Sequence, residues 1–303
     1  MGNVCRYFNL LSGLVANMNR NNKKILSWAF YDWANSVYST TVMAGFFPIF
    51  FEKYWSNPED VIQSTYQLGI ANSLSSIIIA LIAPILGAIA DKGSVKKKLL
   101  ILFAFLGVVM TGGLWFVQQG EWKVAIFFYV ISSVGFMAGN IFYDSLLPSV
   151  AGKDNVDYVS SLGFSLGYLG GGLLFLVNVN MYLNPEWFGI SDSSTAIRLS
   201  FVSVAVWWGI FTIPIMLYVP EPSKSHIISI KDALLSGYQQ LKETYIHIRE
   251  MKIIGTFLMA YWLYEDGVAT IIRMAVKVGS AMGFASSDLI TAILMVQFIG
   301  FPA

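Results

Sequence analysis

Charged residues, histidine and cysteine are all scarce in this chain of 303 residues. Asp, Glu, Lys and Arg together make up 12% of it, against roughly 25% in an average soluble domain. This deficit excludes both an ordinary soluble domain and a disordered chain. Cys5 is the single cysteine, which excludes a secreted scaffold held by disulfide bonds. The formal net charge of +1 provides no basic surface for nucleic acid.

Apolar residues are abundant instead, at 56% of the chain with a mean hydropathy of +0.62. A helix needs about 20 mainly apolar residues to cross a membrane. Eight runs approach or reach this length: Ile25–Phe51, Leu68–Ala90, Leu99–Val117, Val124–Leu147, Val159–Val179, Leu199–Val219, Ile253–Ala275 and Leu289–Ala303. We therefore predict an all-α integral membrane protein with eight helices, of which the last is incomplete.

The basic residues predict the orientation, because cytoplasmic loops carry an excess of Lys and Arg. With a cytoplasmic N-terminus, most of them fall on the cytoplasmic side: Arg6, Arg20, Lys23, Lys24, Lys92, Lys96, Lys97, Lys98, Lys153, Lys224, Lys231, Lys242, Arg249 and Lys252. The others lie outside or at the outer end of a span: Lys53, Lys123, Arg198, Arg273 and Lys277. We therefore expect the N-terminus to be cytoplasmic.

Three interpretations stay open for the first 24 residues. Arg6 followed by Leu10–Ala16 loosely imitates a signal peptide, but a complete run containing Asp32 follows at once. A Met-Gly start suggests myristoylation, yet Arg6 stands where Ser or Thr is expected. In the third interpretation translation starts at Met18, which begins a short cytoplasmic lead by itself.

The longest polar connection joins the sixth and seventh runs, at residues 220–252. Its apolar residues recur at spacings of three and four, at Ile230, Leu234, Tyr238, Leu241, Tyr245 and Ile248. This spacing predicts an amphipathic helix along the cytoplasmic interface. The chain then divides into a cytoplasmic tail at 1–24, a six-span half at 25–219, this linker at 220–252 and an incomplete second half at 253–303.

The connection between the second and third runs carries a charged motif. It reads Gly87-Ala-Ile-Ala-Asp91-Lys92-Gly93-Ser94-Val95-Lys96-Lys97-Lys98. A tight cytoplasmic loop that obeys the positive-inside rule accounts for it. It also resembles the loop signature of the major facilitator superfamily, although Ser94 stands where that family usually has glycine and the lysines lie one place late.

Other segments resemble one branch of that superfamily, the autophagy-related vacuolar amino-acid effluxers and their bacterial relatives. They are Ser27-Trp-Ala-Phe-Tyr-Asp32-Trp-Ala-Asn35-Ser, Thr41-Val-Met-Ala-Gly-Phe-Phe-Pro48, Phe142-Tyr-Asp144-Ser-Leu-Leu-Pro148, Ser161-Leu-Gly-Phe-Ser-Leu-Gly-Tyr-Leu-Gly-Gly and Tyr264-Glu-Asp-Gly-Val-Ala-Thr-Ile-Ile. The resemblance extends from about Lys23 to the end of the chain.

The resemblance implies a secondary transporter with two six-helix halves around a cavity that opens alternately to each side. The membrane is then a bacterial plasma membrane, or a vacuolar membrane if the chain is eukaryotic. That fold has twelve spans, so we expect a complete six-helix N-terminal half plus the first one or two helices of the second, in a fragment or a shortened protein. Gly87, Asp91 and Lys92 are implied to form a cytoplasmic gate with a helix of the second half.

The ionisable residues of the seventh run are the deepest in the membrane. Glu265 and Asp266 lie about 18–20 Å past its start, just beyond mid-membrane. A charge at such a depth costs roughly 2.5–3.5 kcal/mol, so each one needs a reason. We hypothesise that one of the two couples protons or binds a substrate ammonium group, while Arg273 neutralises it or meets a substrate carboxylate. In the alternative, a break at Gly267 merely exposes both carboxylates to water.

Two further acidic residues lie nearer the cytoplasmic side. Asp32 is about 10 Å into the first run, and Asp144 about 5 Å from the end of the fourth. Asn35 shares a helix face with Asp32, and Asn140 shares one with Asp144. We assign the two carboxylates to the cytoplasmic gate and the two amides to the substrate pathway. The alternatives are that Asp32 anchors a neighbouring helix and that Asp144 caps or snorkels at the interface.

Glycine recurs every fourth residue in the fifth run, at Gly163, Gly167 and Gly171. No strand precedes these glycines, so a dinucleotide-binding loop is excluded. They predict the close approach of a neighbouring helix. His226 and His247 lie in the linker without a metal-ligand pattern, so we expect no metal, no cofactor and no enzyme activity.

These observations favour secondary active transport of a small solute, such as an amino acid, driven by protons. The expected partners are the solute, the lipid bilayer and protons. A membrane-embedded assembly protein, whose carboxylates tie helices together, is the alternative from another class. A further alternative is a transporter fragment without activity.

Overall fold

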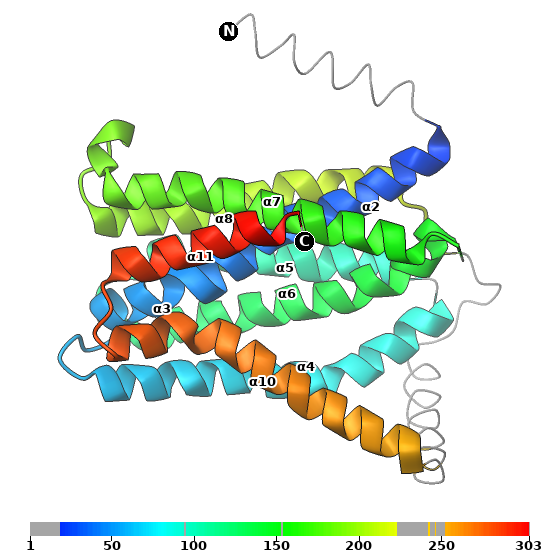
Figure 1. The fold of residues 1–303 in the computed structure, drawn as a ribbon, viewed down its shortest axis with the longest axis horizontal. Helices are drawn as coiled ribbons and strands as arrows, with labels where there is room; N and C mark the ends of the chain where they lie inside the picture. The colour runs from blue at the N-terminus through cyan, green and yellow to red at the C-terminus, as the bar shows by residue number, and fades with distance from the viewer. Residues whose placement is uncertain are drawn as a thin grey trace, which may run out of the picture.

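The computed structural model describes residues 19–93, 95–152, 154–222, 242, 246 and 252–302. Within these ranges the regular structure is helical, and the helices form one bundle (Figure 1). The predicted amphipathic helix of the linker lies almost wholly outside the described residues, as does most of the N-terminal tail. The all-α fold predicted for the membrane-spanning runs is confirmed.

The first predicted run forms an unbroken helical path that changes its winding. It begins with α2 (Arg20–Val37) and continues through the π-helical turns η1 (Tyr38–Phe46). A short α3 (Phe47–Phe50) and a second π-helical segment, η2 (Phe51–Trp55), complete it. Pro48 in α3 has no backbone N–H to donate, which interrupts the hydrogen-bond ladder where the winding changes. The helical path starts at Arg20, five residues before the predicted run.

Among the described residues, five helices are long and apolar enough to cross a membrane, and they correspond to the second to sixth predicted runs. They are α4 (Val61–Gly93), α5 (Lys96–Gly113), α6 (Trp122–Ala151), α7 (Val156–Leu183) and α8 (Ser193–Tyr218). Short 3₁₀ turns follow two of them, at η3 (Leu114–Phe116) and η4 (Pro185–Phe188). The observed α4 extends beyond the predicted run at both ends, because polar helix termini outside the hydrocarbon do not register as apolar sequence.

The seventh and eighth predicted runs are α10 (Lys252–Ala281) and α11 (Ser286–Gly300). The five helices that are long and apolar enough to cross a membrane do not include α10, α11 or the first helical path. The reason is that α11 has 15 residues and α10 carries four ionisable groups between Glu265 and Lys277. In the first helical path, α2 begins with the basic residues Arg20, Lys23 and Lys24 and also includes Asp32.

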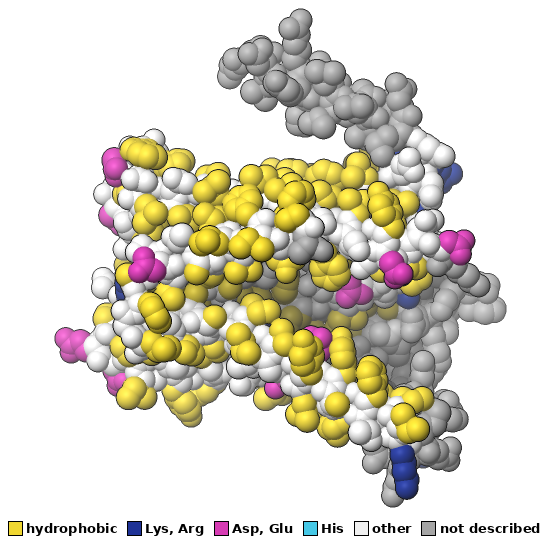
Figure 2. Space-filling view, in the orientation of Figure 1, with side chains coloured by type: hydrophobic (Ala, Val, Ile, Leu, Met, Phe, Trp, Pro, Cys, Tyr) yellow, Lys and Arg dark blue, Asp and Glu magenta, His cyan; other side chains and the backbone are white. Residues whose placement is uncertain are grey.

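In the bundle, α2 packs against α7 and α8, and α5 packs against α6 and α8. In addition, α4 lies along α6, and α11 lies along α7 (Figure 1). Aromatic stacking joins the layers, with ring centroids 4.0 Å apart for Phe47 and Tyr129 and 4.1 Å for Trp28 and Tyr143. Apolar side chains also cover much of the outer surface, as a lipid-facing protein requires (Figure 2).

The basic helix ends gather at one end of the bundle. Lys24 Nζ donates to the carbonyl of Ser149 at 2.9 Å, which joins the start of α2 to the end of α6. Lys97 Nζ donates to the carbonyl of Val219 at 2.9 Å, so the start of α5 meets the end of α8. The Glu221 carboxylate accepts from the backbone N–H of Lys97 at 3.1 Å, where it caps the positive end of α5. The segments expected on the cytoplasmic side therefore lie together.

Glycine permits a close helix approach between α5 and α6. A Cβ atom at Gly135 would lie 2.7 Å from the backbone nitrogen of Gly107 and 2.8 Å from the carbonyl oxygen of Phe103. Backbone atoms cannot turn aside as a side chain can. The two helices are therefore held at a spacing that only glycine allows.

Replacing Gly135 with valine is expected to push α5 and α6 apart and to destabilise the bundle by about 1–3 kcal/mol or more. The matched control is Gly69→Val in α4, where a Cβ atom would meet nothing within 4 Å. Thermal denaturation in detergent, followed by gel filtration, compares the two variants. Equal melting temperatures would contradict the packing described here.

Candidate functional site

Two amides join the first helix to α6 in the interior of the bundle. Asn35 Nδ2 donates to Asn140 Oδ1 at 2.5 Å, and Asn35 is 1% exposed. Beside them, a Cβ atom at Gly139 would lie 2.9 Å from the Tyr31 hydroxyl, so α2 and α6 are in close contact. The structure thus brings together two candidates that the sequence had placed on separate helices.

Asp32 lies against the glycine face of α7. Its Oδ1 accepts a hydrogen bond from Ser36 Oγ at 2.9 Å within the same helix. A Cβ atom at Gly167 would lie 2.9 Å from the Asp32 carboxyl carbon and 2.7 Å from Ser36 Oγ. The carboxylate therefore occupies space that a larger side chain on α7 would fill.

The other two predicted glycines also lie where α7 crosses the first helix. A Cβ atom at Gly163 would lie 2.8 Å from the Tyr143 hydroxyl and 2.9 Å from the Trp28 ring. One at Gly171 would lie 2.9 Å from Thr40 Oγ1. All three glycines thus line contacts of α7 with its neighbours.

The remaining gate candidates differ in their surroundings. Asp144 is exposed on α6, and among the described residues its carboxylate has no hydrogen-bond partner. Gly87 lies on α4, where a Cβ atom would meet nothing within 4 Å. Asp91 and Lys92 belong to the last turn of α4, so the helix continues past the predicted loop start; their side chains lie outside the described ones.

The deep charges of α10 line a groove between α10 and α4. Its volume is about 700 Å³, and its lining combines both helices: Gly69, Asn72, Ser73, Ser76, Ile77, Trp262, Glu265, Asp266, Ala269, Thr270, Arg273 and Met274. Glu265 and Asp266 are exposed in it. Acidic and basic groups therefore share one cavity with the amide and hydroxyl groups of α4.

Arg273 connects α10 to the first half of the chain. Its Nη1 donates to Ser76 Oγ at 3.1 Å, and its Nη2 contacts Met137 Sδ at 3.4 Å. The sequence hypothesis paired Arg273 with Asp266, but within the described residues no ion pair joins them. The guanidinium instead turns toward α4 and α6, because Ser76 offers an acceptor there.

A polar layer continues from the groove into the first half. Tyr129 Oη donates to Asn72 Oδ1 at 2.8 Å, and Asn72 Nδ2 contacts Met274 Sδ at 3.6 Å. The Tyr38 hydroxyl lies 2.7 Å from Ser132 Oγ and 2.9 Å from Ser133 Oγ. These tyrosines were not predicted as site residues, since a buried tyrosine in an apolar run resembles any other core aromatic.

The sequence also missed a buried ion pair between Lys277 and Glu52. Lys277 Nζ donates both to the Glu52 carboxylate and to Ser64 Oγ, the latter at 2.8 Å. Both charges lie at the predicted outer ends of their spans, and Lys277 was classed with scattered outer residues. The available signal was their opposite sign at corresponding positions, just past the outer ends of the first and seventh runs.

No group of three or more His, Cys, Asp or Glu side chains in the described residues is arranged to hold a metal ion. What the described helices do form is an all-α membrane bundle with a charged groove between its helices. Secondary transporters place their solute sites between membrane helices in the same way.

A family model described as vacuole effluxer Atg22 like matches residues 61–302, and the chain belongs to this family. It is 36% identical over 287 residues to an uncharacterized MFS-type transporter, YxiO, of Bacillus subtilis, covering 94% of this chain and 67% of the relative. It is 21% identical to autophagy-related protein 22 of Yarrowia lipolytica, over 67% of this chain and 47% of that protein. With autophagy-related protein 22-1 of Penicillium rubens the identity is 25%, over 74% and 49% of the two chains.

The comparisons confirm the resemblance predicted from the motifs, and the chain belongs to a family whose relatives include an MFS-type transporter. The chain spans about two thirds of the Bacillus relative and about half the length of the two fungal relatives.

The amide pair between α2 and α6 gives a direct test of the site geometry. Asn35→Ala and Asn140→Ala are each expected to lower the stability by about 0.5–2 kcal/mol, because each leaves a buried or half-buried amide without its partner. The loss of stability in the double variant should be smaller than the sum of the two single losses, by about 0.5–1.5 kcal/mol. Thermal unfolding of the four proteins measures this coupling. Asn180→Ala is the control, since that amide donates to Leu176 of its own helix; additive losses would contradict the pairing.

Proposed function

We propose that the protein is a secondary active transporter that moves a small zwitterionic solute, such as an amino acid, by alternating access coupled to protons. The observation that supports this most strongly is the groove between α4 and α10, which holds Glu265, Asp266 and Arg273. A volume of about 700 Å³ suits a small solute with its water.

The energetic argument begins with the position of these charges. Ionisable groups within a span are expensive in hydrocarbon, so they face a wet cavity or a partner. Glu265 and Asp266 are exposed in the groove, while Arg273 reaches Ser76 across it. A groove that is open enough to expose both carboxylates also admits a charged solute.

A zwitterion matches the two signs of charge in the groove. The guanidinium of Arg273 presents a planar fork that suits a carboxylate. Asp266 lies seven residues earlier, about 10 Å along the axis, and helix side chains tilt toward the N-terminus. The carboxylate of a solute is therefore assigned to Arg273, and its ammonium group to Glu265 or Asp266.

Proton coupling is assigned to the carboxylate that does not hold the ammonium group. Exposure on alternate sides of the membrane lets such a group bind a proton from one compartment and release it to the other. Asn35 and Asn140 belong to the solute pathway, since their hydrogen bond closes the space between α2 and α6.

The cytoplasmic gate is assigned to the basic end of the bundle. Asp32, Asp144 and the Gly87, Asp91 and Lys92 motif all belong to helix portions near that end. Charged groups that meet there in one state and separate in the other would set which side of the groove is open.

Counterflow in proteoliposomes tests the zwitterion assignment. Vesicles loaded with an unlabelled amino-acid mixture are expected to take up a labelled amino acid at least tenfold faster than the corresponding methyl ester, which lacks the carboxylate. Arg273→Gln should reduce this preference to less than twofold. Asp288→Asn, in the exposed first turn of α11, is the matched control and should keep it. Equal preference in Arg273→Gln and the parent would remove Arg273 from solute binding.

The proton assignment has its own readout. Of Glu265→Gln and Asp266→Asn, one is expected to keep counterflow while losing at least tenfold of its uptake driven by a pH gradient. If both variants keep the full response to the gradient, protons are not coupled through α10. If purified, folded protein exchanges no amino acid at all, the membrane-assembly alternative replaces transport of this solute class.

A further inference from the structure

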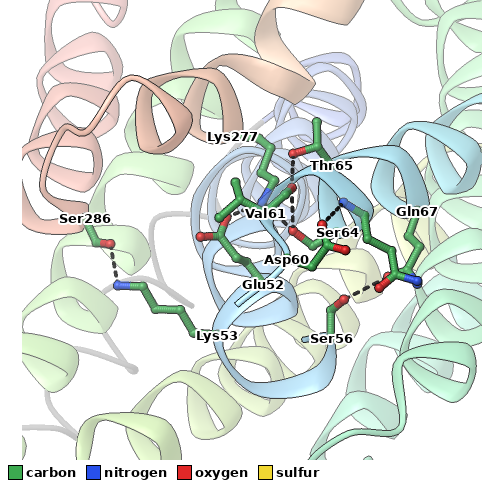
Figure 3. Close-up of polar contacts among 11 residues, drawn as sticks. Glu52, Lys53, Ser56, Asp60, Val61, Ser64, Thr65, Gln67, Lys277 and Ser286 are labelled. Carbon is green, nitrogen blue, oxygen red and sulfur yellow. Dashed lines mark hydrogen bonds and ion pairs between the residues drawn. The ribbon is translucent and has the colours of Figure 1, made fainter. Parts of the chain in front are cut away.

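The end of the bundle opposite the basic end carries a buried ion pair between parts of the chain 225 residues apart. Lys277, near the end of α10, is 1% exposed, and Glu52 in η2 is 8% exposed. Ser64, in the first turn of α4, accepts a second hydrogen bond from Lys277 Nζ at 2.8 Å (Figure 3). The Lys277 side chain thus inserts into a polar site of the first half of the chain, formed by Glu52 and Ser64 and called the socket below.

The socket is held together independently of the lysine. Ser56 Oγ donates to Gln67 Oε1 at 2.8 Å, which ties the end of η2 to α4. Ser64 Oγ in turn donates to the carbonyl of Val61 at 3.0 Å (Figure 3). Glu52 and Ser64 are therefore presented on a fixed frame, and α10 supplies the movable partner.

Contact between α10 and the first half is concentrated at this end. Val276 and Lys277 are 3% and 1% exposed, whereas Ile253 and Trp262, earlier on α10, are 87% and 64% exposed. Figure 1 shows the same arrangement, with the start of α10 diverging from the bundle and its end meeting α3 and α4. At the rim, Lys53 Nζ donates to Ser286 Oγ at 2.9 Å in an exposed contact between the same two regions.

The contribution of a buried ion pair to stability depends strongly on its geometry. Each charge loses several kcal/mol of hydration on burial, and only the partner and the added hydrogen bond compensate. If one partner is removed, the other remains buried without compensation. If the two regions separate, both charges regain water. Such a pair therefore favours a closed arrangement without making the open one prohibitive, which a gate requires.

We propose that Glu52, Ser64 and Lys277 form a latch that holds this end of the transporter closed and that opens when the groove is exposed to this side. With the predicted orientation, this is the non-cytoplasmic side. The proposal rests on the proposed transport function for its purpose, but the closure itself does not depend on which solute is carried. Glu52 and Lys277 act as positioning residues for the two halves, since neither lines the groove.

Thiol labelling tests the latch without any transport assay. Cys5 is the single cysteine, so a Cys5→Ser chain offers a background without thiols. Val276→Cys then reports on the buried contact next to Lys277, and Ser287→Cys, at an exposed position, reports on access of the reagent itself. A membrane-impermeant maleimide is applied to the full chain in proteoliposomes.

With the latch intact, the thiol of Val276→Cys is expected to react slowly and that of Ser287→Cys quickly. Adding Glu52→Gln should raise the reaction rate of the Val276→Cys thiol at least tenfold, because the unpaired lysine drives the contact open to reach water. Lys53→Gln is the matched control: it removes the neighbouring exposed contact and should change the rate less than twofold. The exchanged pair, Glu52→Lys with Lys277→Glu, should return the rate to within threefold of the parent.

The proposal is overturned if the Val276→Cys thiol in folded Glu52→Gln reacts at the parental rate, or if the exchanged pair reacts as fast as Glu52→Gln. Gel filtration confirms folding, and if Glu52→Gln aggregates, the exchanged pair decides alone. Failure of counterflow with normal latch behaviour would contradict the solute assignment only. A parental labelling rate with normal counterflow would contradict the latch only.

Discussion

The cost of placing a charge in hydrocarbon governs where this chain carries its few ionisable groups. Basic residues gather at one end of the bundle, where Lys24 and Lys97 bind the carbonyl ends of neighbouring helices. The charges that enter the spans either face a wet groove, as Glu265 and Asp266 do, or bury against a partner, as Lys277 does. Each location satisfies the same constraint in a different way. The groove and the buried pair both involve α10, which packs against the first half of the chain.

Hydropathy predicted the helices well, because backbone groups in a membrane must be satisfied within the segment. The helix ends were less predictable: α4 starts at Val61, seven residues before the apolar run, since a helix continues into polar sequence outside the hydrocarbon. Glu265 and Asp266 of the groove were singled out from their depth in the seventh run, whereas the groove residues of α4, such as Asn72 and Ser76, were not predicted. The partner of Arg273 was also not predicted, because Ser76 is an ordinary serine until α4 and α10 are placed together. The pairing of Glu52 with Lys277 likewise depends on contacts across 225 residues, which no local pattern records.

The first helical path has a central place in this arrangement. It carries Asp32 against α7, Asn35 against α6 and Glu52 against α10. Its winding changes to π-helical turns between the second and third of these contacts, and such turns are frequent at functional sites. Movement of α10 relative to this path would therefore alter the groove and the ion pair together, which is how a single transition can couple a binding site to a gate.

The central claim is that the groove between α4 and α10 is where a zwitterionic solute binds. Solute protection of a single thiol measures this most directly. Thr270 lines the groove and is exposed in it, so Thr270→Cys in the Cys5→Ser chain provides a reporter. A saturating amino acid is expected to slow maleimide labelling of the Thr270→Cys thiol at least threefold and to leave labelling of the Ser287→Cys thiol unchanged. Labelling at position 270 that stays constant under conditions in which the protein exchanges amino acids would contradict the account.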